Sequence, residues 1–113
     1  MENEKEIILD VGAGYGENLI RRAGKNPDQR FLVVEPDPRN LPKGALPANL
    51  SWIIGKAGEG NPLPFKENAI DEVNLDFVLV SVYGEQEEEN FPQVAEGILK
   101  EAFRVLKPEG KVF

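Results

Sequence analysis

The chain has 113 residues, of which 41% are hydrophobic and 29% are charged, a composition typical of one globular domain. We therefore expect residues 1–113 to form a single domain. The absence of cysteine and histidine excludes disulfides and thiolate chemistry and removes the commonest general base and transition-metal ligand. No apolar run reaches the roughly 20 residues that a membrane span needs. The charged start MENEKE lacks the apolar core of a signal peptide, so a cytoplasmic location is expected.

The formal net charge is −7, from 20 acidic and 13 basic residues. Non-specific nucleic-acid binding depends on Lys and Arg side chains that neutralise phosphates, so this charge argues against nucleic acid as a partner. The small basic cluster of Arg21, Arg22 and Lys25 falls at the end of a predicted helix, where cations stabilise the helix dipole. The acidic run EQEEE at 85–89 lacks the spaced oxygen ligands and the turn glycine of a calcium loop. We predict a solvated surface there and no metal site.

Apolar runs alternate with helical or loop-like stretches along the chain. A first helix is predicted at 17–23, with Gly24 as its stop. Residues 39–50 contain two prolines and a glycine, so any helix there is short or broken. The clearest helical periodicity runs from Pro92 to the turn Pro108-Glu109-Gly110. The predicted strands are 7–11, 31–34, 51–55 and 73–82, followed by the opening of a fifth at 111–113.

This alternation predicts a three-layer α/β fold, in which helices cover both faces of a parallel sheet. Ligands of such sheets bind beyond the carboxyl ends of the strands, where the strand order reverses. The glycine-rich loop after the first strand and the turn after Val34 therefore belong to the same edge of the sheet.

The loop itself contains Gly12, Gly14 and Gly16, directly behind the first strand. Glycine permits positive φ and lets a ligand approach the backbone, and the helix that follows offers free N–H groups to anionic ligand atoms. Glu17 in the first helical turn suits the helix dipole but not a neighbouring pyrophosphate. The loop therefore favours a nucleoside without phosphates, and a tight turn with no ligand is the alternative.

Glu35 ends the second predicted strand. It follows Gly12 at roughly the 20-residue spacing of the acid that binds ribose hydroxyls in dinucleotide-binding proteins. Its two carboxylate oxygens can accept hydrogen bonds from both hydroxyls. A solvated acid in the proline-rich turn after Val34 is the alternative.

Four segments resemble the motifs of class I S-adenosylmethionine-dependent methyltransferases. ILDVGAGYG (8–16) resembles acid-x-G-x-G-x-G, and VVEPDP (33–38) resembles the second strand with its ribose-binding acid. GEGNPLPF (58–65) is similar to G-D-A-E-x-L-P-F, and ILKEAFRVLKPEGKVF (98–113) resembles L-x-E-x-x-R-V-L-K-P-G-G. The resemblance implies a Rossmann-like, mainly parallel sheet in the order 3-2-1-4-5 and S-adenosylmethionine as the cofactor.

The resemblance also implies which residues hold this cofactor. In the family, the glycine motif wraps the methionine end and the acid of the second strand binds the ribose. The corresponding residues of this sequence are Asp10, Gly12, Ala13, Gly14 and Gly16 for the methionine end, and Glu35 for the ribose.

Three further positions follow from the same resemblance. Glu59 is the counterpart of the acid that contacts the adenine amino group, with the Ala57 backbone nearby. The alternative aligns Gly55-Lys56-Ala57 with G-D-A, which replaces that acid by a lysine, and a lysine cannot accept a hydrogen bond. Asp76 is the candidate for the methionine ammonium, because a carboxylate within an apolar run needs a cationic or hydrogen-bonding partner.

The implied activity is transfer of a methyl group to an unidentified small-molecule or protein acceptor, by this chain as an enzyme or as the cofactor-binding core of one. Two alternatives remain open: a non-catalytic module that binds an adenosyl ligand, and an NAD-binding oxidoreductase domain. Tyr15 and Tyr83 are among the candidates for a base, and no catalytic residue is assigned.

Family members complete a seven-stranded sheet whose last two strands form an antiparallel hairpin. This sequence stops within the fifth predicted strand, before that hairpin. An edge strand without a neighbour invites pairing with another chain. We therefore expect either a homodimer through this edge or a fragment of a longer protein.

Overall fold

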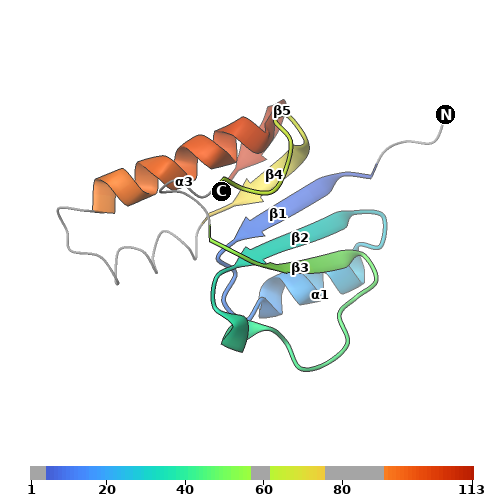
Figure 1. The fold of residues 1–113 in the computed structure, drawn as a ribbon. Coiled ribbons are helices and arrows are strands. Elements are labelled where there is room, and N and C mark those ends of the chain that lie inside the picture. The colour runs from blue at the N-terminus through green and yellow to red at the C-terminus, as the bar shows by residue number, and fades with distance from the viewer. Residues whose placement is uncertain (1–4, 57–61, 76–90) are drawn as a thin grey trace.

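A parallel β-sheet forms the centre of the molecule (Figure 1). The computed structural model describes residues 5–56, 62–75 and 91–113. The strands are β1 Ile7–Val11, β2 Arg30–Glu35, β3 Leu50–Ile54, β4 Ile70–Asn74 and β5 Leu106–Val112. They lie in the order β3-β2-β1-β4-β5, and each neighbouring pair is parallel. This order confirms the predicted sheet.

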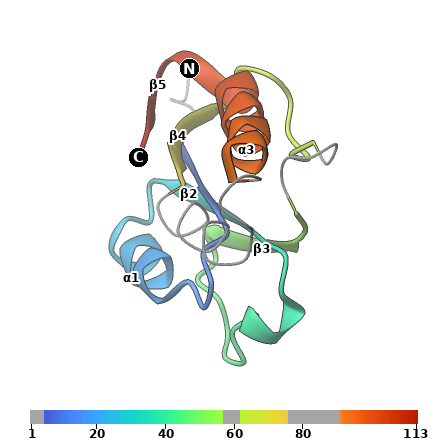
Figure 2. The same ribbon diagram turned by 90° about the vertical axis from the view of Figure 1, so that its left-hand side faces the viewer.

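Two helices cover opposite faces of the sheet, α1 Glu17–Lys25 and α3 Phe91–Val105, and Figure 2 shows the sheet between them. Successive side chains of a strand point to opposite faces. Phe31 of β2 accordingly packs with Leu19 of α1, and Leu32 packs in the core that contains Ile98 of α3. The described part therefore has the three layers that were predicted. In these described ranges, neither helix is long and apolar enough to cross a membrane.

The segment after β2 contains the short 3-10 helix η1 Pro38–Asn40. This agrees with the prediction that residues 39–50 allow only a short or broken helix. Asp37 caps it, because its Oδ1 accepts a hydrogen bond from the Arg39 N–H at 2.9 Å.

Three predicted boundaries were wrong, those of the fourth strand, the first helix and the fifth strand. The fourth strand begins at Ile70 and its described part ends at Asn74, whereas 76–82 of the predicted strand lie outside the described residues. The early start of this strand was not predicted because it contains two acids. Both acids have partners: the Asp71 carboxylate is 3.0 Å from Lys107 Nζ, and Glu72 is paired with Arg22 at 2.7 Å.

The first helix also runs further than predicted. Gly24 lies inside its last turn, and α1 ends only after Lys25. The Asn26 side chain donates to the Arg22 carbonyl at 2.8 Å and satisfies an acceptor at this end. That end contact offsets the modest cost of a glycine in a helix, about 1 kcal/mol relative to alanine.

Strand β5 starts directly after α3, without the separating turn that was predicted at Pro108-Glu109-Gly110. Ile70 of β4 pairs with Leu106 and Glu72 pairs with Lys111, so extra residues of β5 form a bulge. A Cβ on Gly110 would lie 2.6 Å from Leu106 Cδ1 and 2.9 Å from the Asp71 carbonyl oxygen. Only glycine fits at this position without a shift of its neighbours.

An ion pair on α3 holds the segment that precedes β4. Arg104 donates to the carbonyls of Leu63 and Phe65, each at 2.9 Å, and its Nε lies 2.8 Å from Glu101 Oε2. The Leu63 N–H donates in turn to Glu101 Oε1 at 2.6 Å. The acid and the arginine of the last family-like motif therefore bind the L-P-F part of the third.

This ion pair makes stability depend on pH. The hydrogen bond from Arg104 lowers the pKa of Glu101 below its ordinary value of 4.5, so its stabilising effect is present above that value and is lost as the pH falls through the lower pKa of the folded state. We expect Glu101→Gln to lower the free energy of unfolding at neutral pH and to flatten its decline below about pH 4.5. Urea unfolding over a pH series measures both.

Glu96→Gln is the matched control for that variant. Glu96 lies on the same helix and pairs with Lys100 at 3.3 Å, but its side chain is 66% exposed, so its loss should change stability by less than about 0.5 kcal/mol. If the free energy of unfolding of Glu101→Gln falls with decreasing pH as steeply as that of the wild type, this account of the ion pair is contradicted.

Candidate functional site

The turn Gly12–Gly16 follows the carboxyl end of β1, and its glycines have left-handed backbone conformations. Its three glycines have φ of +69°, +63° and +67°, which residues with a Cβ rarely adopt. The Gly12 N–H donates to the Val34 carbonyl at 2.7 Å and ties the turn to β2. The prediction that these glycines supply positive φ is confirmed.

Trp52 of β3 gives a second reason for a glycine at position 16. A Cβ on Gly16 would be 2.6 Å and 2.9 Å from two ring carbons of Trp52. The Trp52 indole is half-buried and packs with the core on the α1 side of the sheet. Its Nε1 is buried and has no hydrogen-bond partner in the described part of the chain. Sequence reasoning did not find Trp52, because nothing local links it to the turn.

Glu35 points at the glycine turn and is only 3% exposed. Its Oε1 accepts a hydrogen bond from the Gly14 N–H at 3.0 Å. Its Oε2 accepts from the Asp37 N–H at 2.7 Å and from the Asn40 side-chain amide at 3.2 Å. The alternative interpretation of Glu35 as a solvated acid was therefore wrong.

The remaining predicted residues of the loop lie at the same edge. Asp10 is half-buried and pairs with Val33 on one side and Asn74 on the other. Ala13 is also half-buried and packs against the core beneath α1. The structure thus brings Asp10, Gly12, Ala13, Gly14, Gly16 and Glu35 together.

The predicted residues Ala57, Glu59 and Asp76, and also Tyr83, lie outside the described residues. Just before Ala57, the chain contacts the candidate site, because the Gly55 N–H donates to the Glu35 carbonyl at 3.0 Å. Lys56, which follows, is exposed.

An exposed charged pair follows Glu35, and an exposed phenol lies within the glycine turn. Arg39 Nη2 lies 2.8 Å from Asp37 Oδ2, and the hydrogen bond from Arg39 lowers the pKa of Asp37 below its usual value. The hydrogen bond to Asp37 in turn raises the pKa of Arg39, and Tyr15 of the glycine turn is 68% exposed. Asp37 is therefore ionised at neutral pH and largely neutralises Arg39. The first turn of α1 lacks a side-chain cap in the described ranges, since Gly16 occupies the capping position.

Arg22 of the basic cluster has a structural role. Arg22 makes a two-point contact with Glu72 of β4, at 2.7 Å and 3.1 Å, and its guanidinium lies 5.5 Å from the centre of the Phe31 ring. These contacts fix α1 on the sheet.

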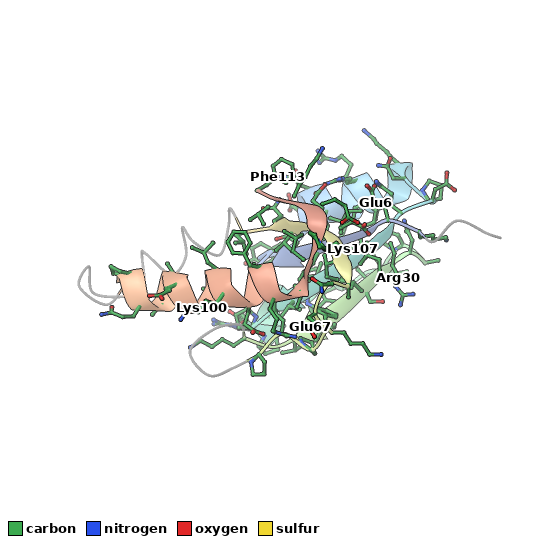
Figure 3. The ribbon with its side chains drawn as sticks, turned by 90° about the horizontal axis from the view of Figure 1, so that it is seen from above. Glu6, Arg30, Glu67, Lys100, Lys107 and Phe113 are labelled. Atoms are coloured by element: carbon green, nitrogen blue, oxygen red, sulfur yellow. The ribbon has the colours of Figure 1, made fainter. Side chains whose placement is uncertain are left out.

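Two cavities of about 500 Å³ and about 510 Å³ open at the other end of the strands. They share Ile7, Arg30 and Ala69 in their linings, and Figure 3 shows Arg30 and Lys107 at this end. None of the described residues that line these two cavities is a predicted site residue.

Comparison with known proteins matches residues 9–113 to a protein family described as a methyltransferase domain. The chain is 32% identical to the ubiquinone/menaquinone biosynthesis C-methyltransferase UbiE of Rickettsia prowazekii, over 96% of this chain and 43% of that protein. This chain covers 40% to 43% of the length of three curated relatives of that name. The chain thus spans less than half of the relatives it matches.

Solved structures show the same fold. A TehB-like SAM-dependent methyltransferase from Corynebacterium glutamicum has a TM-score of 0.65 at 16% identity, over 99% of this chain and 55% of that chain. PKMT2 from Rickettsia typhi, in complex with AdoHcy, has a TM-score of 0.65 at 23% identity, over 95% of this chain and 20% of its own.

The contact between Gly16 and Trp52 can be tested by substitution. We expect Gly16→Ala to lower the free energy of unfolding by about 2 kcal/mol or more, because the new Cβ meets the indole and the residue keeps a left-handed φ. Urea denaturation measures the change. The control is Gly24→Ala: a Cβ there has no neighbour within 4 Å, so it should stabilise the helix by roughly 0.5–1 kcal/mol. Equal effects of the two variants would refute the steric argument.

Proposed function

Because the chain belongs to the methyltransferase domain family, we propose that it binds S-adenosylmethionine at the Gly12–Gly16 turn and takes part in methyl transfer to an acceptor. The observation that carries this proposal is the buried Glu35 carboxylate, which faces a bare backbone turn and is bonded to the Gly14 N–H at 3.0 Å.

The site has the chemistry that a nucleoside ligand requires. Glycines at alternate positions of the turn leave its backbone without side chains, so a ligand can approach the main-chain groups closely. Glu35 supplies hydrogen-bond acceptors that match the two hydroxyl donors of a ribose. Glu17 in the first turn of α1 disfavours a pyrophosphate at the same place. These features support an adenosyl ligand over NAD.

We propose the following roles within the site. Asp10 and the backbone of the glycine turn hold the methionine end of the cofactor, and Glu35 holds the ribose. By resemblance to the family, Glu59 with Ala57 meets the adenine, and Asp76 meets the methionine ammonium. The turn residues in this assignment are Gly12, Ala13, Gly14 and Gly16.

S-adenosylmethionine supplies a methyl group bonded to a positively charged sulfur. The contribution of this chain is to bind and orient, because holding a donor in line with its acceptor contributes several kcal/mol to a reaction of this kind. Glu35 and the turn fix the nucleoside on the rigid edge formed by β1 and β2. Tyr15 is exposed beside this edge and is a candidate for contact with an acceptor, whereas no catalytic base is assigned.

The acceptor is proposed to be a small molecule or a protein. The name of the relative in Rickettsia prowazekii assigns to that enzyme a C-methylation in ubiquinone/menaquinone biosynthesis, which favours a small-molecule acceptor. The net charge of −7 argues against nucleic acid.

Glu35→Gln tests the proposed ribose contact. A glutamine keeps the shape of the side chain but places an N–H₂ group where the carboxylate accepts hydrogen bonds, so we expect the affinity for S-adenosylhomocysteine to fall about tenfold or more. Isothermal titration calorimetry measures it, with NAD as a ligand that should not bind. Glu96→Gln on the exposed face of α3 is the charge-matched control. Wild-type affinity in the Glu35 variant would remove this residue from the site.

We also propose that two copies of the chain associate through the outer edge of β5, which has no neighbouring strand in the described ranges. An open edge offers unpaired backbone groups to another strand, and Phe113 beside it is 56% exposed. Size-exclusion chromatography with light scattering should give twice the chain mass of 12.5 kDa. A single-chain mass at high concentration would rule out this pairing.

A further inference from the structure

The Glu35 carboxylate has too few free acceptor sites for a ribose. A carboxylate offers about four acceptor positions on its two oxygens. Three are already occupied, by the Gly14 N–H, the Asp37 N–H and the Asn40 side-chain amide. A ribose brings two hydroxyl donors to this group, so one of the three present donors has to leave before both hydroxyls can bind.

Asn40 is the donor that can leave most easily. Its bond to Glu35 is the longest of the three, at 3.2 Å against 2.7 Å and 3.0 Å. The other two donors are main-chain N–H groups, whose movement would rearrange the glycine turn or the start of η1. A side-chain amide only has to change its rotamer.

The backbone around Asn40 is independent of this contact. The Asn40 N–H donates to the Asp37 carbonyl at 3.0 Å, and the Leu41 N–H donates to the Pro38 carbonyl at 3.3 Å. Asp37 also caps η1 through the Arg39 N–H. The side chain of Asn40 can therefore rotate away while η1 stays in place.

Burial points the same way. Glu35 is 3% exposed, so a ligand that reaches its oxygens must displace something that covers them. Asn40 is half-buried and supplies the one side-chain donor on this carboxylate among the described residues.

We propose that the Asn40 side chain competes with the ribose for Glu35 Oε2 and is displaced when the nucleoside binds. The inference rests on the proposed nucleoside site, and it makes Asn40 a determinant of nucleoside affinity. The competition applies to the second hydroxyl only, because the fourth acceptor position can take the first while Asn40 stays bound.

The test compares two ligands on wild type and Asn40→Ala by isothermal titration calorimetry. The ligands are S-adenosylhomocysteine and its 3′-deoxy analogue, which has a single ribose hydroxyl. We expect the variant to bind S-adenosylhomocysteine about threefold to tenfold more tightly, the effect of one long hydrogen bond of ordinary net strength. Its affinity for the 3′-deoxy analogue should change less, so the ratio of the two affinities widens.

Arg39→Ala is the matched control. Arg39 lies in the same 3-10 helix, and its exposed side chain pairs with Asp37 and not with Glu35. The ratio of the two affinities should therefore stay at the wild-type value. Circular dichroism and urea unfolding verify that each variant is folded.

The outcomes separate the inference from the proposed function. If the proteins bind both ligands but Asn40→Ala has an unchanged ratio or a weaker affinity for S-adenosylhomocysteine, Asn40 does not compete and the inference is wrong. If wild type and both variants bind neither ligand, the nucleoside site itself is wrong and the inference falls with it.

Discussion

The hydrogen bond between the Gly14 N–H and the Glu35 carboxylate is the contact on which the candidate site depends. It exists because β1 and β2 are parallel neighbours, so their carboxyl ends meet and the segments that leave them face each other. The bond from the Gly12 N–H to the Val34 carbonyl sets the distance between these segments. A buried carboxylate is costly unless its oxygens are satisfied, and here main-chain N–H groups supply most of that compensation.

Residues of elements distant in sequence hold the glycine turn and α1 in place. Trp52 of β3 lies against Gly16 and limits the turn to a residue without a side chain. Arg22 ties α1 to β4, so the helix that begins at the turn cannot shift freely on the sheet. On the opposite face, the pair Glu101–Arg104 holds the chain before β4 against α3. These contacts anchor the edge of the sheet that carries the glycine turn and Glu35.

Much of this arrangement could be predicted from sequence because its determinants are local. The five residues of β1, the alternate glycines and the acid at the end of β2 are short patterns with direct geometric consequences. The early start of β4 could not be predicted, since Asp71 and Glu72 are tolerated in a strand only through partners on β5 and α1. Trp52 and Asn40 were missed for the same reason: each acts through a contact across the fold. The predicted adenine and ammonium contacts at Glu59 and Asp76 stay predictions.

A crystal structure of the chain with S-adenosylhomocysteine tests the central claim most directly. The account predicts that both ribose hydroxyls lie within hydrogen-bond distance of the Glu35 oxygens, with the methionine end against the Gly12–Gly16 turn. A ligand bound elsewhere, or a ribose held without Glu35, would contradict it.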